Sequence, residues 1–438
     1  MRAFGSDGNM NPMYLPRSSK WSMNRRKRRP NYFSLLILLL VILFGYYFNQ
    51  VYLPSRPNPF EPTPTPTRSA ESFVSEAETM FAEGKLVQAI ASYQEAIKSS
   101  PQDAALYVAV ARVQVLAGKS AEAQANAENA LLLDSSNALA HAVRAWAMNA
   151  QGNNADALSK IEEALQLDPN NGLAHAYYTE ILVDSESFDN VAKAIEESKI
   201  ALALAPDTME AHRARGILLE ATQNYEEAIR EFEAAKAIND DIPDLYIRLG
   251  LNYRILGVSD QAIEAFTRAD VLNPSDPLPD LYISRTYAGI GEFAKALQYA
   301  ETAVQNNPTD ARLRGNFGVM YYRNLFWAEA IEQLRLAVDG GISPEGDAIE
   351  GIPLSNDVRV AEYYYTYALA LARTGNCGDA LQLAQEIQAK IPADENAQFA
   401  ASETIRICEE NLASPQVSTS TPAANSAPSA APSAVSTP

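Results

Sequence analysis

The sequence predicts an all-α protein, and two observations support this prediction. Leu and Ala dominate the 47% of residues that are hydrophobic, and runs of β-branched residues are scarce, which favours helices over strands. Alanine also recurs at a nearly fixed spacing through most of the chain, as expected for a repeated helical unit. The hydrophobic content is ample for a large core, whereas two cysteines and three histidines are too few for a disulfide-rich scaffold or a zinc array.

The charge of the chain is unevenly distributed. The net charge is −19, but residues 1–30 hold eight Lys or Arg against one acid, so the other 408 residues carry −26 (−19 less +7). A body that acidic repels phosphate backbones, and we expect no nucleic-acid binding. The sequence contains no Cys-x-x-Cys, His-Glu-x-x-His or P-loop, and no Ser/His/Asp triad can be assembled. We therefore expect no metal site, no cofactor and no catalytic residue.

An apolar segment follows the basic N-terminal tail (1–30). Residues 31–53 carry no charge, and about 22 helical residues rise about 33 Å, enough to cross a hydrocarbon core of roughly 30 Å. We expect one transmembrane helix here, with its basic N-terminal side in the cytoplasm by the positive-inside rule. The long basic tail and the absence of an Ala-x-Ala site favour an uncleaved anchor over a cleaved signal peptide, which stays the alternative.

Two proline-containing segments flank the rest of the chain. Residues 54–69 alternate Pro with small polar residues, which favours polyproline II and gives a semi-rigid stalk of about 45 Å. Residues 413–438 are mostly Ser, Thr, Ala and Pro without any charge, and we expect them to be disordered. The folded domain therefore lies between these two segments.

Between the flanks, the chain repeats a unit of 34 residues in most of its length. One phase of the repeat is marked by Ala89, Ala123, Ala157, Ala194, Ala228, Ala262, Ala296, Ala330 and Ala380. A second alanine follows seven residues after each of these, except in the last unit, where Ile387 stands. The clearest unit, 243–276, carries Tyr246, Leu249, Gly250, Tyr253, Ala262, Phe266, Ala269 and Pro274. This pattern resembles the tetratricopeptide repeat, a helix-turn-helix of 34 residues, with Tyr in place of its leading Trp.

The resemblance implies a right-handed superhelical solenoid in which no unit can bury its apolar face alone. The expected units are 70–103, 104–137, 138–171, 172–208, 209–242, 243–276, 277–310, 311–344 and 361–394, followed by a capping helix over 395–412. Three extra residues fall in the turn of unit four (184–190), and sixteen more lie within 340–360. The longer insertion is either functional or a tolerated elaboration of the surface.

In this family, the first helix of each unit lines a concave groove where peptides lie. Units one to five place mostly Val, Leu, Ala and acids there, with Trp146 as an exposed aromatic candidate. Units six to nine place a basic and aromatic set on the same side, namely Arg248, Arg254, Tyr282, Arg285, Arg312, Asn316, Tyr322, Arg323, Tyr365 and Arg373. On an acidic domain, this set suits acidic or carboxylate-ended peptides, although the family's clamp of Lys and Asn is not reproduced. The alternative is that these arginines form ordinary surface salt bridges.

The histidines and cysteines have structural interpretations. His141, His175 and His212 occupy the same place in successive units, and stacked helices about 10 Å apart cannot bring them to one metal. We expect them to pack, with a pH-sensitive ladder as the alternative. Superposing neighbouring units puts Cys377 and Cys408 at the same rim, where a disulfide and two buried free thiols both stay open.

The function expected from these features is a membrane-anchored scaffold that presents its groove to protein or peptide partners on the extracytoplasmic face. The alternative is an accessory subunit of an envelope enzyme or secretion complex. No usable Asn-x-Ser/Thr acceptor occurs, which favours a bacterial envelope over a eukaryotic lumen. The oligomeric state is open, because Tyr363, Tyr364, Tyr365 and Tyr367 suit a dimer contact, whereas Tyr364 and Tyr367 also occupy packing positions.

Overall fold

The computed structural model of the protein describes residues 32–48, 68–185, 187–344 and 346–413. The chain divides into two parts, 1–67 and 68–438, and each is considered by itself. The basic tail (1–30), most of the expected stalk (54–67) and the C-terminal tail from residue 414 lie outside the described residues.

The first part contains one described helix, α1 (Tyr32–Tyr47). It has 16 residues and so rises about 24 Å, and its described side chains are exposed. Among the residues that the structure describes, no helix is both long enough and apolar enough to cross a membrane. The transmembrane helix expected over 31–53 is thus not found, because α1 ends at Tyr47 and residues 49–53 lie outside the described part.

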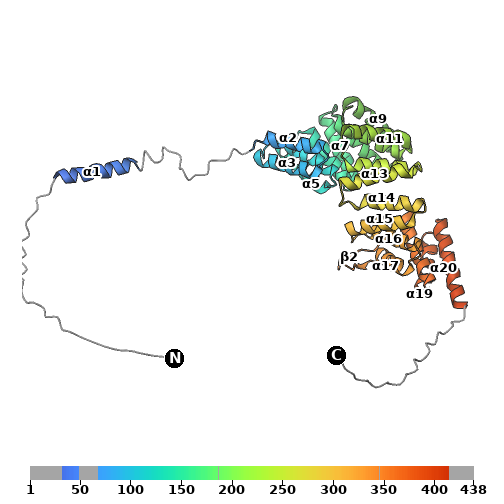
Figure 1. The fold of residues 1–438 in the computed structure, drawn as a ribbon. Coiled ribbons are helices and arrows are strands. Elements are labelled where there is room, and N and C mark those ends of the chain that lie inside the picture. The colour runs from blue at the N-terminus through green and yellow to red at the C-terminus, as the bar shows by residue number, and fades with distance from the viewer. Residues whose placement is uncertain (1–31, 49–67, 186, 345, 414–438) are drawn as a thin grey trace, which may run out of the picture. The chain divides into compact units, whose positions relative to one another are not determined.

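The second part is a stack of helix pairs, drawn from blue to red in Figure 1. In chain order its elements are α2 (Ala70–Ala82), α3 (Leu86–Ser99), α4 (Ala104–Leu116), α5 (Ser120–Leu133), α6 (Ala138–Asn149), α7 (Asn154–Leu167), α8 (Gly172–Asp184), α9 (Phe188–Leu204), α10 (Met209–Ala221), α11 (Tyr225–Ile238), α12 (Pro243–Ile255), α13 (Ser259–Leu272), α14 (Pro277–Gly289), α15 (Phe293–Asn306), α16 (Ala311–Arg323), α17 (Trp327–Val338), β1 (Gly341–Ile342), β2 (Ala348–Ile349), α18 (Val358–Arg373), α19 (Cys377–Lys390) and α20 (Glu395–Ala413). The expected all-α solenoid is confirmed.

Local sequence explains where the helices begin. Several first helices of a pair start after an Asp or Asn whose side chain accepts a hydrogen bond from a backbone N–H of the first turn. Asp103 accepts from Ala105 at 3.0 Å, and Asn137 accepts from Ala140 at 3.0 Å. Because these caps recur at the same place in successive units, the sequence repeat becomes a structural repeat.

The turn within each pair needs one residue with positive φ. Glycine supplies it in several units, as in Gly118 (φ 72°) and Gly257 (φ 78°). In the pairs α10–α11 and α16–α17, however, Gln223 (φ 63°) and Leu325 (φ 67°) adopt the same conformation without glycine. The stacking of neighbouring helices therefore imposes this turn even where the local sequence disfavours it.

The core of each pair is a large side chain against a small one. A Cβ placed on Gly250 would lie 2.5 Å from the ring of Phe266, and one on Gly216 would lie 2.6 Å from the ring of Phe232. The alanines that mark the repeat, such as Ala262, have no exposed surface. Only residues without bulk fit where the helices approach this closely, which explains the repeated Gly and Ala.

The two insertions lie differently from the expectation. The turn between α8 and α9 has three residues, like the other turns, and the extra residues instead lengthen α9 to 17 residues, against 14 in α7 and α11. In the later insertion, β1 and β2 form a short antiparallel hairpin, and α18 begins at Val358, ahead of the expected start of unit nine. The first insertion therefore adds only helix, whereas the second adds helix as well as loop.

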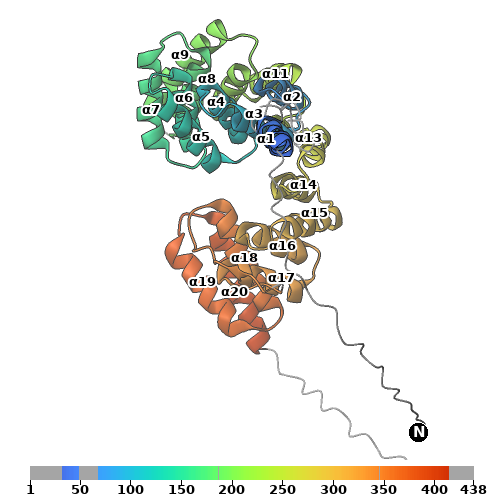
Figure 2. The same ribbon diagram turned by 90° about the vertical axis from the view of Figure 1, so that its left-hand side faces the viewer.

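The solenoid curves so strongly that its first unit meets its fifth and sixth. Figure 2 shows α4 to α9 in one group of helices and α16 to α20 in another. The Asn239 side chain donates a hydrogen bond to the Phe81 carbonyl at 2.9 Å, which joins the residue after α11 to the last turn of α2. One core cluster combines Ala77, Leu86 and Ile90 with Phe232, Ile242 and Leu245. The N-terminal end of the stack is thus covered by units five and six.

Candidate functional site

The concave side of the N-terminal units (70–242) is filled by the protein's own side chains. Arg112 on α4 forms an ion pair with Glu210 on α10, although the two residues are 98 positions apart in the chain. Glu210 is 4% exposed at its side chain. Since this pair reaches across the curve of the solenoid, it occupies the space where a ligand of a tetratricopeptide groove would lie.

A second buried network continues this filling. Glu180 accepts hydrogen bonds from Trp146 Nε1, at 2.7 Å, and from Arg213, which also donates to Asp244 at 2.7 Å. The Trp146 ring stacks on Tyr177 with centroids 4.3 Å apart. Trp146 is 2% exposed, so the expectation of an exposed aromatic residue in this groove is wrong. The sequence could not show that Tyr177, one unit later, covers the indole.

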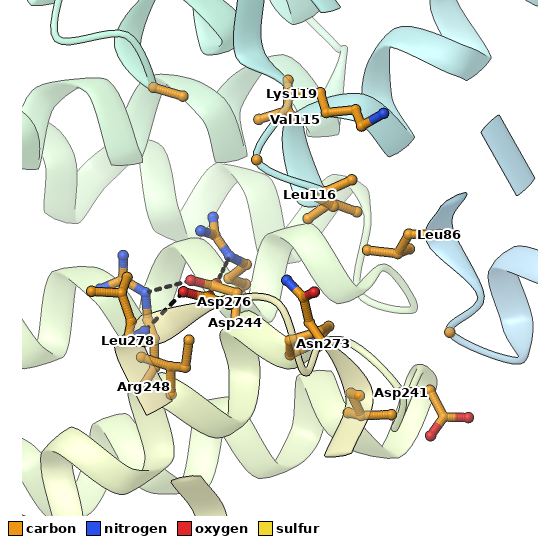
Figure 3. A pocket seen from close by; sticks show the side chains of 18 of the residues that line it. Leu86, Val115, Leu116, Lys119, Asp241, Asp244, Arg248, Asn273, Asp276 and Leu278 are labelled. Carbon is orange, nitrogen blue, oxygen red and sulfur yellow. Dashed lines mark hydrogen bonds and ion pairs between the residues drawn. The ribbon is translucent and has the colours of Figure 1, made fainter. Parts of the chain in front are cut away.

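A cavity of about 840 Å³ opens beside this network. Figure 3 shows Leu86, Val115 and Leu116 from the first two units facing Asp244 and Arg248 of unit six. The charges around it are largely paired within the protein. Arg248 lies 3.7 Å from Asp244, and it lies 3.6 Å from Glu220. Six acidic and five basic side chains line the cavity, so it offers a ligand an excess of only one charge.

Five of the six arginines predicted for the groove divide into two kinds according to their partners. Three of them have carboxylate partners, as the salt-bridge alternative predicted. Besides Arg248, Arg312 lies 3.5 Å from Asp357, and Arg323 lies 3.8 Å from Glu362. Arg312 and Arg323 are largely exposed, so these pairs contribute little to stability.

Arg254 and Arg285 are of the second kind, because neither has a carboxylate within ion-pair distance in the described part of the chain. Arg254 on α12 lies over the Tyr282 ring of α14, 5.5 Å from its centroid. Arg285 donates to Asn316 at 3.4 Å and to the Tyr363 hydroxyl at 3.3 Å. Both guanidinium groups are half-buried. The structure thus brings these predicted residues of three successive units together.

The structure adds two residues to this cluster that the sequence did not indicate. Arg359 lies one turn before Tyr363 on α18, and the Tyr363 hydroxyl accepts a hydrogen bond from Arg285. Burial, followed by the charges of Arg285 and Arg359, lowers the pKa of Arg254. Tyr363 is 1% exposed and reaches Arg285 across Gly315, where a Cβ would lie 2.6 Å from the tyrosine ring. The early start of α18 positions Arg359, and repeat spacing alone gave no signal for that start.

The remaining predicted groove residues form a smaller aromatic contact. Arg373 donates to the Tyr322 hydroxyl at 3.1 Å, and its guanidinium lies 5.8 Å from the Trp327 ring centroid. Tyr365 is half-buried, and burial, followed by the charge of Glu362, raises its pKa to about 12. Tyr364 and Tyr367 are buried, as the packing interpretation predicted, and Tyr363 is buried as well.

His175 and His212 each link the end of the preceding unit to the second helix of their own unit. His175 contacts Glu197 at 2.5 Å through Nδ1, and the Pro169 carbonyl at 3.0 Å through Nε2. His212 repeats this geometry with Glu231 and Pro206, at 2.8 and 3.0 Å. The described residues contain no cluster of His, Cys, Asp and Glu that could hold a metal ion. Each imidazole ties the preceding turn to the second helix of its unit.

The two cysteines are joined. Cys377 at the start of α19 and Cys408 in α20 form a disulfide, with their Cα atoms 5.4 Å apart. Cys408 is fully buried. The disulfide attaches the last helix to the last pair, at the end of the solenoid that no further unit covers.

Family models identify the repeats. Models described as tetratricopeptide repeat match residues 109–172, 189–243, 243–276 and 283–347. The solenoid belongs to the tetratricopeptide repeat family. These proteins are generally scaffolds that bind protein partners, which agrees with a structure built from packed helix pairs. No curated protein matches this sequence.

Several solved structures are similar to this chain. The APC/C hetero-tetramer Cut9-Hcn1 matches with a TM-score of 0.50 and 16% identity, over 87% of this chain and 79% of that one. The Pseudomonas aeruginosa pilF structure matches with a TM-score of 0.40 and 22% identity, over 46% of this chain and 90% of that one. A tetratricopeptide repeat protein from Parabacteroides merdae matches with a TM-score of 0.38 and 18% identity, over 57% of this chain and 98% of that one. The match to Cut9-Hcn1, at a TM-score of 0.50 and 16% identity, shows a common fold.

Proposed function

We propose that this tetratricopeptide repeat protein is a scaffold, not an enzyme, and binds protein partners along the concave side of α12, α14, α16 and α18. The observation that carries this proposal is the contrast between the two ends of the groove. In units one to five, buried ion pairs such as Arg112 with Glu210 fill the interior. In units six to nine, Arg254 and Arg285 face the groove without a carboxylate partner among the described residues.

The partner segment is acidic. The chain as a whole has a charge of −19, so a concentration of guanidinium groups on one surface is a local reversal of its potential. Guanidinium groups pair with carboxylates in bidentate geometry, and tyrosine rings beside them add contact area at low entropic cost. Tyr282 lies beside Arg254, Tyr322 lies beside Arg373 and Tyr365 is half-buried in the same unit as Arg373, so these rings suit that role.

The proposal includes a membrane anchor at the N-terminal side. The apolar, uncharged segment 31–53 and the basic residues before it support an anchor with a cytoplasmic N-terminus and the solenoid on the extracytoplasmic face, in a bacterial envelope. Protease treatment of intact cells that express the full chain tests this part. Digestion of the solenoid with protection of the basic tail is the expected result, and protection of the solenoid would contradict it.

Peptide binding tests the groove. We expect a labelled peptide rich in Asp and Glu to bind the full-length protein, with an affinity that falls as salt is added, and a Gln-substituted peptide of equal length to bind much more weakly. Replacement of Arg254, Arg285, Arg323 and Arg373 by Gln removes this preference, whereas Arg230→Gln on the outer helix α11 is the matched control and retains it. Equal binding of both peptides, or no binding of either, would contradict the proposal.

A further inference from the structure

Three guanidinium groups converge in the groove from helices that are not sequence neighbours. Arg254 lies at the end of α12, Arg285 in α14 and Arg359 at the start of α18. Arg254 lies over the ring of Tyr282, which is one turn before Arg285 on α14. Arg285 in turn donates to the hydroxyl of Tyr363, which is one turn after Arg359 on α18. These contacts bring three like charges together, which is electrostatically unfavourable. A folded protein retains such an arrangement when a bound group of opposite charge offsets the repulsion.

The protein itself supplies too little negative charge at this point. Glu362 lies 3.0 Å from Arg359 and 3.8 Å from Arg323, so one carboxylate is shared by two guanidinium groups. Arg254 and Arg285 have only neutral partners among the described residues, in the form of a tyrosine ring, an amide oxygen and a tyrosine hydroxyl. The cluster of four arginines and one glutamate therefore carries an excess of three positive charges.

The neutral partners hold the guanidinium groups in place. The Tyr363 hydroxyl accepts from Arg285 and donates to the Arg312 carbonyl at 3.0 Å, so its position is fixed from both sides. Asn316 accepts from Arg285 and donates to Ser284 at 3.1 Å. Because these groups are already ordered, a ligand would not have to order them on binding, which reduces the entropic cost of association.

We propose that Arg254, Arg285 and Arg359 form a receptor for a compact dianionic oxyanion group displayed on the bound partner segment. This inference rests on the proposed function and specifies the chemistry that the groove recognises. Each guanidinium presents parallel N–H donors that match two oxygens of a phosphoryl or carboxylate group, and two negative charges offset most of the local excess. A phosphorylated side chain and a pair of adjacent carboxylates both have this chemistry.

Thermal unfolding of the full-length protein with inorganic phosphate as the probe is the first test. Low millimolar phosphate, compared with chloride at equal ionic strength, is expected to raise the Tm of the wild type. The double variant Arg254→Gln and Arg285→Gln is expected to lose this phosphate-specific increment, whereas Arg230→Gln retains it. In chloride, the Tm of the same double variant is expected to be no lower than that of the wild type, because the loss of two like charges relieves repulsion.

A marked loss of stability in chloride would show instead that the two arginines have a structural role and would overturn the inference. An equal phosphate increment in the wild type and the double variant would overturn it as well.

Peptide affinity then distinguishes the two sources of the dianion. Three peptides of one acidic sequence are compared, which differ at a single place by phosphoserine, Asp-Asp or Ser-Ser. The wild type is expected to bind one of the first two peptides more tightly than the Ser-Ser peptide. Removal of each guanidinium group is expected to lower the affinity for that peptide at least about tenfold, as for the loss of a hydrogen bond to a charged group. Arg230→Gln again serves as the control.

The outcome also separates this inference from the proposed function. If all three acidic peptides bind the wild type equally and the double variant binds like the wild type, the dianion receptor is wrong while the acidic groove stands. If no acidic peptide binds the wild type, both are wrong.

Discussion

The N-terminal and C-terminal units use arginine in opposite ways on the same scaffold. In units one to five, each groove-facing arginine in the buried network has carboxylates beside it, as Arg213 has Glu180 and Asp244. In units six to nine, Arg254 and Arg285 have tyrosine and asparagine instead. The repeat fixes the backbone position of both kinds of arginine, but residues of other units decide whether the guanidinium stabilises the fold or remains available to a partner.

The curvature of the solenoid underlies this difference. The first unit contacts the fifth and sixth, so the N-terminal units enclose their own interior and charges there have to be paired before they are buried. The C-terminal units extend away from this contact and end in α20. Their groove stays accessible, and water solvates the unpaired guanidinium groups while no partner is bound.

The largest expected effect concerns the buried pair. Arg213→Met removes the partner of Glu180, whose side chain is 5% exposed, and is expected to reduce the free energy of unfolding by about 3 to 5 kcal/mol. Arg285→Met, the same change in the C-terminal units, is expected to alter it by less than about 1 kcal/mol. Urea denaturation followed by circular dichroism measures both. Equal losses would remove the distinction between the two regions.

The disulfide is expected to matter almost as much, and only at the C-terminal end. It closes a loop of 31 residues, so its loss in a Cys377→Ser and Cys408→Ser variant is expected to cost about 3 to 4 kcal/mol. Hydrogen exchange locates the effect. We expect faster exchange in α19 and α20 and unchanged exchange in α4 to α8, and a uniform increase along the chain would contradict this.

A smaller effect is expected to be equal in the two regions. Gln223→Gly in unit five and Leu325→Gly in unit eight replace residues with positive φ, and each is expected to raise the free energy of unfolding by about 1 kcal/mol. Urea denaturation measures these variants too. A gain in one region only would show that the turn geometry depends on the groove and not on the repeat.

The smallest expected effect is a pH dependence that belongs to the N-terminal units, which contain all three histidines. Burial lowers the pKa of His175, but the hydrogen bond to Glu197 and the one to the Pro169 carbonyl outweigh burial, so its pKa is raised above the usual 6.5. The contribution of protonated His175 to the free energy of unfolding is therefore fully present below pH 6.5, and it is lost as the pH rises through the folded-state pKa. Tm between pH 6 and 8 is expected to fall more for the wild type than for His175→Gln, and parallel curves would contradict this.

The sequence was sufficient to predict the repeat because the repeat depends on local rules. Gly250 and Ala262 are small where helices approach, Asp103 and Asn137 cap helices, and Gly257 provides a turn. Each of these requirements is set by residues that are close in the sequence. The pairing of helices and the place of the last helix α20 follow from the same short-range pattern. The length of α1 could not be predicted from the apolar run alone, because apolar residues by themselves do not determine where a helix ends.

The tertiary structure alone decided which groove residues are available. Trp146 is buried because Tyr177 covers it, Arg112 is neutralised by a glutamate 98 residues later, and Arg359 joins Arg254 because an insertion adds a turn to α18. The sequence determined the family, the periodicity and the side of the helix on which each arginine lies. Contacts between distant units, set by the curvature of the stack, determined which of those arginines are paired, because ion pairing depends on distances in space that a period of 34 residues does not contain.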